Sequence, residues 1–496
     1  MTALDILFIV LAVQVLLGGF DNLWHHEITE ALPGRVSART EIGLHAAREL
    51  IYAGAFIIFA WFQPHGWLAL LFGAVLVGEI VITLADFLEE DRTRKLPPFE
   101  RVLHTVLAIN YGVVLALLTP ILWDWFKLEG AGLIVDRGLW SLFFTAAAIG
   151  VFGWGVRDAI AWRDLNKRAA GRTEPARLRP SERTVLITGA TGFLGQDLVH
   201  RLTGRGDRVI ALSRDTLKAR ALFGPRVDVT DNLDLLADDT RIHAIVNLAG
   251  ANVADMPWWH SRKQLLLDSR LDTTRAVLAL IKRLRHKPNV LVSASAVGAY
   301  GDQGETPLPE HAGRPLGVFT ADLCRVWENE ACHAVKYGVR VCRLRFGLIF
   351  GRDGSAFPKL ALGRLFGIAP QFGDGQQWMS WVHKHDALRA IEFALDRQEL
   401  AGPVNVAAPA EVRHGEVMRA IGGRGLLMPI PAALLRLGLG EMSELFLASQ
   451  RVRPQRLQTA GFRFNYPDIK TACRDLTGKP KAGCETAKRL HDTTPV

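Results

Sequence analysis

The sequence contains few cysteines and no pattern that would pair them. Only five occur among 496 residues, all in the second half of the chain, and none forms a CxxC pair. Their odd number and their spacing argue against a disulfide framework and against a cysteine zinc site. They indicate reduced thiols in a cytosolic compartment.

Two further signals are missing. The N-terminus lacks the basic start and the small-residue cleavage site of a secretory signal peptide. No DNA- or RNA-binding motif accompanies the net charge of +9, and the basic residues cluster beside apolar runs, as they do on the cytoplasmic face of membrane proteins. We therefore expect no nucleic-acid partner.

Long apolar runs are concentrated in the first 165 residues. Five of them are long enough to cross a bilayer, which takes about 20 residues each. We expect spans at Leu4–Trp24, Ile42–Phe62, Trp67–Leu88, Val102–Phe126 and Leu139–Trp162. This region is therefore predicted to be an α-helical transmembrane bundle surrounded by membrane lipid.

Basic residues are distributed unequally between the loops. One set of loops carries Arg35, Arg39, Arg92, Arg94, Lys95 and Arg101, and a basic segment follows the fifth span. The opposite loops carry only Lys127 and Arg137. The positive-inside rule then places the N-terminus outside an inner (cytoplasmic) membrane and the residues after the fifth span in the cytoplasm. An odd number of spans agrees with this arrangement, because it places the N-terminus and the residues after the fifth span on opposite sides.

Ionisable residues occupy the cytoplasmic half of the first four spans. Carboxylates recur with histidines four residues away, and the third span carries a stripe formed by Glu79, Thr83, Asp86 and Glu90. Such residues on several helices can bind one or two metal ions inside a bundle, here iron, manganese or zinc. The candidate ligands are His25, Glu41, His45, Glu49, Glu79, Asp86, Glu100 and His104.

Other interpretations of these residues remain open. Charged side chains collect at helix ends near lipid headgroups, where arginines such as Arg39, Arg48 and Arg101 could pair with them. A proton relay or a quinone site is a further alternative, whereas haem ligation by His45 and His104 would leave many carboxylates unexplained. Because Glu79 lies near mid-membrane, where carboxylates are costly, we expect a functional role.

The stretch TVLITGATGFLG, residues 184–195, predicts a buried strand, a glycine-rich turn and a helix. Its glycines, Gly189, Gly192 and Gly195, are spaced GxxGxxG. The first allows a tight turn, the second lets the backbone approach a pyrophosphate, and the third lets helix and strand pack closely. The helix N-terminus offers free N–H groups to the phosphates. A second apolar strand at 209–212 completes the context of a dinucleotide-binding fold.

The end of that second strand favours NADP over NAD. Ser213 and Arg214 stand where an acid would bind the ribose 2′-hydroxyl of NAD, and arginine suits the 2′-phosphate of NADP. Asp215 complicates this interpretation, and an ordinary surface arginine is the alternative. The expected cofactor-binding residues are Gly189, Thr191, Gly192, Phe193, Leu194, Gly195, Ser213, Arg214, Asn247, Ala249, Gly250 and Ser293.

Residues 184 to about 470 resemble the extended short-chain dehydrogenase/reductase (SDR) superfamily. The likeness is carried by TGATGFLG, VNLAGANV, SASAVGAYGD, LCRVWE, LRFGLIFG, WVHKHD and GPVNVAAP. Together with PIPAALLRLGLGE, SQRVRPQRL and GFRF, they are most similar to its atypical epimerase family, also called sugar-nucleotide epimerase-like proteins. The resemblance implies a Rossmann-type, doubly wound parallel sheet and a nicotinamide cofactor. It does not extend to the first 165 residues.

The catalytic pair of the superfamily is missing. SDR enzymes use a tyrosine as proton donor and a lysine four residues later, and the corresponding segment here runs from Phe319 to Leu323. Tyr466 and Lys470 have the right spacing but lie in the C-terminal tail. Ser295, Tyr300 and His383 remain candidate proton donors, and structural hydrogen bonding is the alternative for all three.

We therefore expect a transmembrane domain at 1–165, a basic linker at 166–183, an NAD(P)-binding Rossmann domain at 184–400, a small C-terminal substrate-side lobe at 401–475 and a polar tail at 476–496. The expected function is a membrane-anchored NADP(H)-binding oxidoreductase that acts on an apolar or lipid-like small molecule and is coupled to a metal site. The alternative is a non-catalytic NADP(H) sensor or assembly protein. A homo-oligomer is left open.

Overall fold

The computed structural model describes residues 2–29, 32–34, 38–93, 98–171, 183–423 and 425–478. They divide into two compact units, and the boundary between the units in the sequence lies near residue 176.

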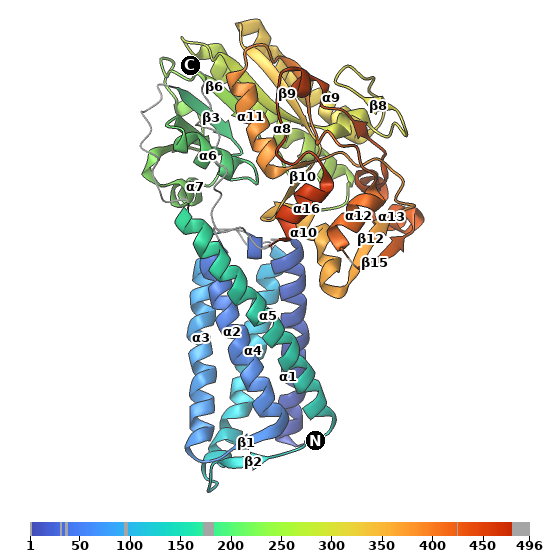
Figure 1. Cartoon of the computed structure of the whole chain (residues 1–496). Helices are drawn as coiled ribbons and strands as arrows, with labels where there is room; N and C mark the ends of the chain where they lie inside the picture. Colours follow the sequence, from blue (N-terminus) through green and yellow to red (C-terminus); the bar gives the residue numbers. More distant parts are fainter. Residues whose placement is uncertain are drawn as a thin grey trace, which may run out of the picture. The chain divides into compact units, whose positions relative to one another are not determined.

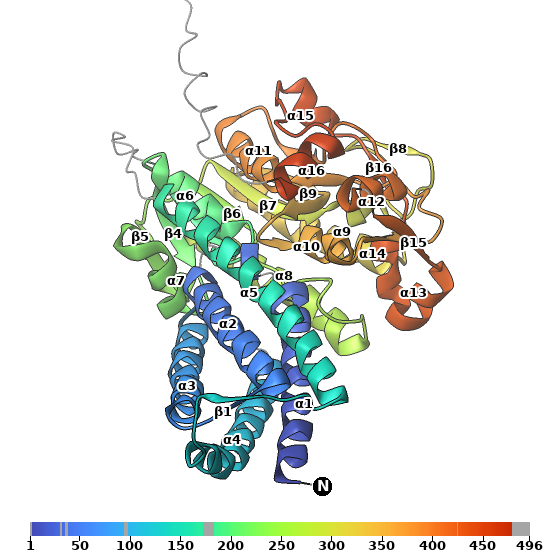
Figure 2. The ribbon, with the colours of Figure 1, turned by 60° about the horizontal axis from the view of Figure 1, so that its bottom comes forward.

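Five long helices make up the first unit (Figure 1): α1 (Ala3–Asp21), α2 (Arg39–Trp61), α3 (Trp67–Thr93), α4 (Pro98–Phe126) and α5 (Leu139–Gly171). They overlap the five predicted apolar segments, although α5 continues to Gly171, past the expected start of the linker at residue 166. Each is long and apolar enough to cross a membrane. A π-helix, η1 (Asn22–Thr29), continues α1. Strands β1 (Phe62–Pro64) and β2 (Gly132–Ile134) pair antiparallel at the end of the bundle that comes forward in Figure 2.

The interior of the bundle has an apolar half and a polar half. Near β1 and β2, the aromatic rings of Phe8, Phe59 and Phe144 pack against one another in an apolar core. The other half buries ionisable side chains: Asp21, His25, Glu41, His45, Glu49, Glu79, Asp86, Glu90, Glu100, His104 and Asp158.

The outer surface of the bundle is apolar. Leu16, Val81 and Ile149 are each 67–68% exposed, and they represent many similar residues on the five helices. Apolar residues outside and ionisable residues inside reverse the distribution found on surface helices of water-soluble proteins.

A seven-stranded, all-parallel sheet forms the centre of the second unit. Its spatial order is β5 (Val227–Thr230), β4 (Arg208–Leu212), β3 (Thr184–Thr188), β6 (Ala244–Asn247), β7 (Val290–Ala296), β9 (Arg340–Phe346) and β14 (Gly402–Val406). The chain proceeds from β3 to one edge, returns to β6 beside β3, and continues to the other edge. This order confirms the predicted Rossmann-type fold and places the topological switch point between β3 and β6.

Helices cover both faces of this sheet. On one face lie α6 (Gly195–Gly204) and α11 (Lys384–Asp396), which contribute the fully buried Leu198 and Ile391. The other face is covered by α8 (His260–Arg283) and α9 (Phe319–Cys332). All five residues of β3 and all four of β6 are buried, as expected for central strands covered on both sides.

Short strands and helices form a C-terminal lobe. Strand β10 (Leu348–Gly351) pairs with β11 (Gly354–Ser355) and β13 (Trp381–His383), β12 (Ile368–Phe372) pairs with β15 (Leu426–Ile430), and β8 (Pro307–Leu308) pairs with β16 (Arg451–Val452). The remaining helices are α7 (Thr216–Phe223), on the side of the main sheet near β4, and α10 (Ala356–Ala361), α12 (His414–Gly422), α13 (Ala432–Leu439), α14 (Glu444–Leu447), α15 (Gln455–Thr459) and α16 (Ile469–Thr477).

The lobe begins differently from the sequence-based expectation. We expected it to start at residue 401, but β14 lies beyond that point and forms the edge of the main sheet beside β9. The strands β10 to β13 precede β14 in the chain and lie outside the main sheet: β10 pairs with β11 and β13, and β12 pairs with β15, which follows β14. A lobe assembled from segments on both sides of a core strand has no single boundary in the sequence.

Candidate functional sites

The turn between β3 and α6 requires glycine at its first and third positions. Gly189 has a φ of +66°, and a Cβ atom there would lie 2.9 Å from the backbone nitrogen of Ala249. A Cβ atom on Gly195 would lie 2.1 Å from the carbonyl oxygen of Gly189, so α6 could not begin this close to the strand. Gly192 is exposed, and its N–H donates to the carbonyl of Gly189 at 3.0 Å. This geometry fits a pyrophosphate lying over Gly192.

A buried hydrogen-bond chain fixes the switch point beside this turn. The Thr188 hydroxyl donates to Asn247 Oδ1 at 2.6 Å, and Asn247 Nδ2 donates to Thr274 at 2.9 Å. The Ala249 N–H donates to the Thr188 hydroxyl at 3.3 Å. The side chains of Asn247 and, on the next strand, Ser293 are buried. These two predicted cofactor residues therefore support the carboxyl-terminal edge of the sheet from inside the protein.

The segment after β4 resolves the role of Asp215. The Asp215 carboxylate accepts from the N–H of Lys218 at 2.9 Å, and its backbone accepts from the N–H of Ala219, so the residue caps α7. The Ser213 side chain hydrogen-bonds the backbone of Asp215, whereas the Arg214 side chain is exposed. The carboxylate that complicated the cofactor assignment is thus bound to a helix terminus.

Lys384 links the glycine-rich turn to the lobe. The sequence motifs did not predict this role. Its ammonium group lies over the ring of Phe193, 4.2 Å from the centroid, and 2.7 Å from Asp197 on α6. It also pairs with Asp353 between β10 and β11. The β10–β11 hairpin is therefore held against the phosphate turn.

A second unpredicted residue, Arg270 on α8, lies beside the end of β6. A Cβ atom on Gly250 would be 3.1 Å from its guanidinium carbon, and the guanidinium stacks over Trp327 at 5.0 Å. Burial lowers the pKa of Arg270. Local sequence could not single out Arg270, because the burial of one arginine depends on packing against α9.

Ser295 and Tyr300 belong to a buried network around Glu328. Arg345 donates to both carboxylate oxygens of Glu328 at 2.7 and 2.9 Å, and Ser295 donates to the same carboxylate at 2.7 Å. Arg345 also donates to the Tyr300 hydroxyl at 2.8 Å, which in turn donates to Asn405 at 2.8 Å.

This network sets the protonation of its members. Burial alone would raise the pKa of Glu328, but the hydrogen bonds and charge of Arg345 outweigh burial and hold that pKa below its usual value. Burial raises the pKa of Tyr300 despite the neighbouring guanidinium. The structure therefore brings two of the three candidate proton donors together, with both hydroxyls bound to protein partners.

His383, the third candidate, lies apart at the junction of β13 and α11. Its Nδ1 accepts from the N–H of His385 at 3.1 Å and so caps α11, and its ring stacks on Tyr466 at a centroid distance of 3.8 Å. Tyr466, which we placed in a remote tail, therefore packs against a predicted site residue, while Lys470 is exposed on α16.

The positions of the missing tyrosine and lysine are packing positions. Phe319 begins α9 and meets Trp258 edge to face at 5.0 Å. Leu323 is 6% exposed in the same apolar cluster, with Leu266. Neither residue can transfer a proton.

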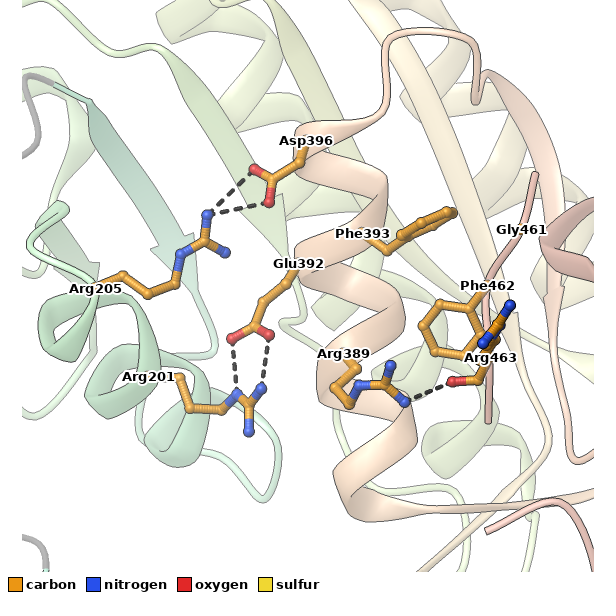
Figure 3. A pocket seen from close by; sticks show the side chains of 9 residues that line it. All are labelled: Arg201, Arg205, Arg389, Glu392, Phe393, Asp396, Gly461, Phe462 and Arg463. Atoms are coloured by element: carbon orange, nitrogen blue, oxygen red, sulfur yellow. Dashed lines mark hydrogen bonds and ion pairs between the residues drawn. The ribbon is translucent and has the colours of Figure 1, made fainter. Parts of the chain in front are cut away.

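A surface cavity of about 380 Å³ lies between α6 and α11 (Figure 3). Arg201 pairs with Glu392 at 2.7 Å, Arg205 pairs with Asp396 at 3.0 Å, and Arg389 donates to the carbonyl of Arg463. Arg201 and Arg205 lie near the C-terminal end of α6 and just beyond it, whereas the phosphate turn precedes the beginning of α6. These contacts already engage both carboxylates and three of the four arginines that line the cavity, and we assign it no ligand.

In the helical unit, four of the eight predicted metal ligands come together. Glu41, His45 and Glu90 form one group, and Glu90, Glu100 and His104 form another, with the ligand atoms of each group within 4.8 Å of one another. Glu90 was placed on the stripe of α3 but was not among the predicted ligands.

The other four predicted ligands have different partners. His25 Nδ1 lies 2.6 Å from Asp21, and Glu49 accepts from Asn22 at 2.7 Å. Glu79 accepts from Arg48, Tyr52 and Thr83, and Asp86 accepts from Arg48 at 2.7 Å. These four residues therefore lie outside the two groups of possible ligands. Helical periodicity indicates on which face of its helix a residue lies, but it does not indicate which helix packs against that face.

The Glu328 network yields a stability prediction. Glu328→Gln should leave a buried guanidinium without its counter-charge and cost about 3–5 kcal/mol, as breaking buried ion pairs does. The Tm of the second unit in purified full-length protein should fall by about 5–15 °C. The matched control on the same helix, Asp322→Asn, removes a half-exposed pair with Arg325 and should change stability by less than about 1 kcal/mol.

The pH dependence follows from the lowered pKa. Ionised Glu328 stabilises the fold above its usual pKa of 4.5, and this contribution is lost as the pH falls through the lower folded-state value. The difference between wild type and Glu328→Gln should therefore stay constant from neutral pH to about 5 and shrink below that. A constant difference down to the acid limit would contradict the role of the ion pair.

Comparison with known proteins identifies the second unit. A model of the NAD dependent epimerase/dehydratase family matches residues 185–407, and a domain of unknown function, DUF1731, matches residues 430–476. The epimerase family protein YfhF of Bacillus subtilis is 34% identical over 301 residues, which cover 60% of this chain and 99% of that protein. The chloroplastic SDR39U1 homolog of Arabidopsis thaliana is 35% identical over 309 residues, covering 60% of this chain and 88% of that protein.

Solved structures agree. The human epimerase family protein SDR39U1, crystallised with NADPH, matches with a TM-score of 0.53 and 26% identity over 59% of this chain and 98% of that chain. A nucleoside-diphosphate sugar epimerase from Corynebacterium glutamicum matches with a TM-score of 0.50 and 26% identity, over 73% of this chain and 72% of that chain. The chain belongs to the NAD(P)-binding epimerase family, an atypical branch of the SDR superfamily.

Proposed function

We propose that this protein is a membrane-anchored, NADP(H)-binding oxidoreductase of the SDR type that acts on an apolar or membrane-associated substrate. The observation that carries the proposal is the exposed Gly192 backbone at the switch point of the sheet, in a chain that also contains five apolar helices. A substrate that partitions into lipid would be the natural one for an enzyme anchored by such helices.

Two observations support NADP as the cofactor. The exposed guanidinium of Arg214 follows β4, where a 2′-phosphate would lie, and the neighbouring Asp215 carboxylate is engaged in capping α7. The human relative SDR39U1 was crystallised with NADPH. When bound, the cofactor would supply or accept a hydride, and the residues of this chain would orient the substrate and provide the proton.

The membrane assignment rests on surface composition and loop charge. The apolar outer surface of the bundle suits lipid, and the loop arginines favour an inner (cytoplasmic) membrane with the N-terminus outside and the nucleotide-binding unit in the cytoplasm. The proposal also includes iron, manganese or zinc in the polar half of the bundle, because carboxylates and imidazoles suit these metals.

A second candidate function is favoured by a specific observation. Phe319 and Leu323 occupy the positions of the catalytic pair, and the hydroxyls of Ser295 and Tyr300 are bound in the Glu328 network. These features suit a non-catalytic NADP(H) sensor or assembly protein, in which the cofactor reports a metabolic state.

Cofactor binding is tested by calorimetry on purified full-length protein. Gly192→Val should abolish NADPH binding, because the side chain would occupy the phosphate path, whereas Gly204→Val at the other end of α6 meets open space and should bind normally. Arg214→Asp should weaken NADPH at least about tenfold more than NADH, the scale of one lost charged contact. Equal losses for the two cofactors would exclude the role of Arg214; the control is Arg397→Asp, at an exposed residue directly after α11.

Turnover separates the two candidate functions. If the protein is an oxidoreductase, it should oxidise NADPH when quinones or membrane lipid extracts are added, and Gly192→Val should not. Tight NADPH binding without oxidation under any of these additions would favour the sensor.

Topology is tested by cysteine labelling in intact cells, on a background without the native cysteines. An impermeant reagent should modify Glu129→Cys, in the exposed loop after α4, and should reach Asp91→Cys, near the end of α3, only after permeabilisation. The reverse pattern would overturn the proposed orientation.

A further inference from the structure

The geometry points to a dinuclear metal centre in the polar half of the helical bundle, with Glu90 as the ligand shared by two divalent cations of the iron, manganese or zinc class. This inference rests on the proposed metal binding and adds the number of ions, the ligand set and the residues that orient it. Glu41 and His45 would complete the first site, and Glu100 and His104 would complete the second.

The shared carboxylate is the first line of evidence. Both three-residue groups contain Glu90, which is fully buried on α3 between contributions from α2 and α4. A carboxylate has two oxygens and can bind one ion with each. Two ions that share such a ligand in a four-helix arrangement are the general pattern of carboxylate-bridged metal centres.

Ligand spacing is the second line of evidence. Two donors bound to one ion at about 2.1 Å each are separated by about 3–3.5 Å. The Nδ1 atom of His104 lies 3.4 Å from Oε2 of Glu90, which fits this separation. The other donors in each group lie within 4.8 Å of one another.

The residues behind the histidines are the third and independent line. Metal-bound histidines characteristically donate their second ring nitrogen to a carboxylate, which fixes the ring and its tautomer. Here Nε2 of His45 lies 3.0 Å from Asp86, and Nε2 of His104 lies 3.0 Å from Asp21. Both histidines thus have Nε2 within 3.0 Å of a carboxylate, with a hydrogen bond formed at His104, and we assign Nδ1 as the metal ligand in each.

These supporting carboxylates are themselves held in place. Asp86 accepts from Nη1 of Arg48 at 2.7 Å, and Asp21 lies 2.6 Å from Nδ1 of His25. The ring of Phe87 stacks on His104 at 5.5 Å and fixes its plane. Ordinary ion pairing at a helix end would not need this repeated arrangement of carboxylate, histidine and carboxylate.

The backbone provides a further indication. The π-helix η1 (Asn22–Thr29) begins directly after Asp21 and carries His25. π-helical turns cost stability and occur frequently at functional sites. Asp21, one of the two supporting carboxylates, is the last residue of α1 before this π-helix begins.

Charge and donor type define the ligand. Glu41, Glu90 and Glu100 are each 0% exposed, and two divalent cations would offset their charge in a low-dielectric interior. Imidazole nitrogen mixed with carboxylate oxygen suits iron, manganese and zinc, whereas calcium and magnesium prefer oxygen alone.

The test is metal stoichiometry in detergent-purified full-length protein that has been stripped with a chelator and titrated with Mn²⁺ alone. Wild type should bind two equivalents. Glu41→Gln and Glu100→Gln should each lose one, and Glu90→Gln should lose both. Glu49→Gln, the same change at a buried position of α2 outside the two groups, should retain two.

Each outcome has a defined meaning. One equivalent in wild type, or two in Glu90→Gln, would overturn the shared ligand, and loss of metal in Glu49→Gln would overturn the ligand assignment. No binding by wild type would exclude metal and leave ion pairing or proton relay for these residues. NADPH affinity, measured on the same samples, verifies folding and tests the nucleotide function separately; if Glu90→Gln does not fold, Glu41→Gln and Glu100→Gln still decide.

Discussion

Burial of carboxylates in an apolar bundle is the constraint on which the helical unit depends. Glu41, Glu90 and Glu100 are fully buried, and an isolated ionised carboxylate in such an interior costs several kcal/mol. Arg48 offsets two other carboxylates, Glu79 and Asp86. A pair of cations shared through Glu90 would neutralise the first group, and it would explain why the histidines face it with supporting carboxylates behind them.

In the second unit, the corresponding constraint is the backbone geometry of the glycine-rich turn. Gly189 and Gly195 let a strand, a turn and a helix approach more closely than any side chain would allow. The buried bonds from Thr188 to Asn247 then hold the two central strands at the point where the chain reverses direction. The result is an exposed backbone edge suited to phosphates, whose position does not depend on the residues that would carry out proton transfer. The geometry of this edge is therefore independent of Phe319, which stands where the resemblance to SDR enzymes led us to expect the tyrosine.

Much of this arrangement could be predicted from local sequence. The glycine spacing, the buried strands and the five apolar segments are short-range signals, and they gave the sheet, the turn and the helices. Glu41 and His45 were predicted as ligands because they share one helical face. Glu90 could not be distinguished from Glu79 on its stripe, since the choice depends on which helix lies opposite.

Long-range pairing explains the remaining differences. The ion pair between Glu328 and Arg345 joins a helix to a strand, and it converts Ser295 and Tyr300 from candidate donors into parts of a buried network. The placement of β14 in the main sheet likewise depends on pairing with β9, and no local feature of residues 402–406 distinguishes it from a lobe strand.

The central claim is that the buried carboxylates of the bundle hold a pair of metal ions, and X-ray absorption spectroscopy of the Mn²⁺-loaded full-length protein tests it most directly. The account predicts nitrogen and oxygen ligands near 2.1 Å together with a second metal at about 3.5–4 Å, the usual separation in two-metal sites. A spectrum with a single ion in an oxygen-only shell, or with no metal neighbour, would contradict it.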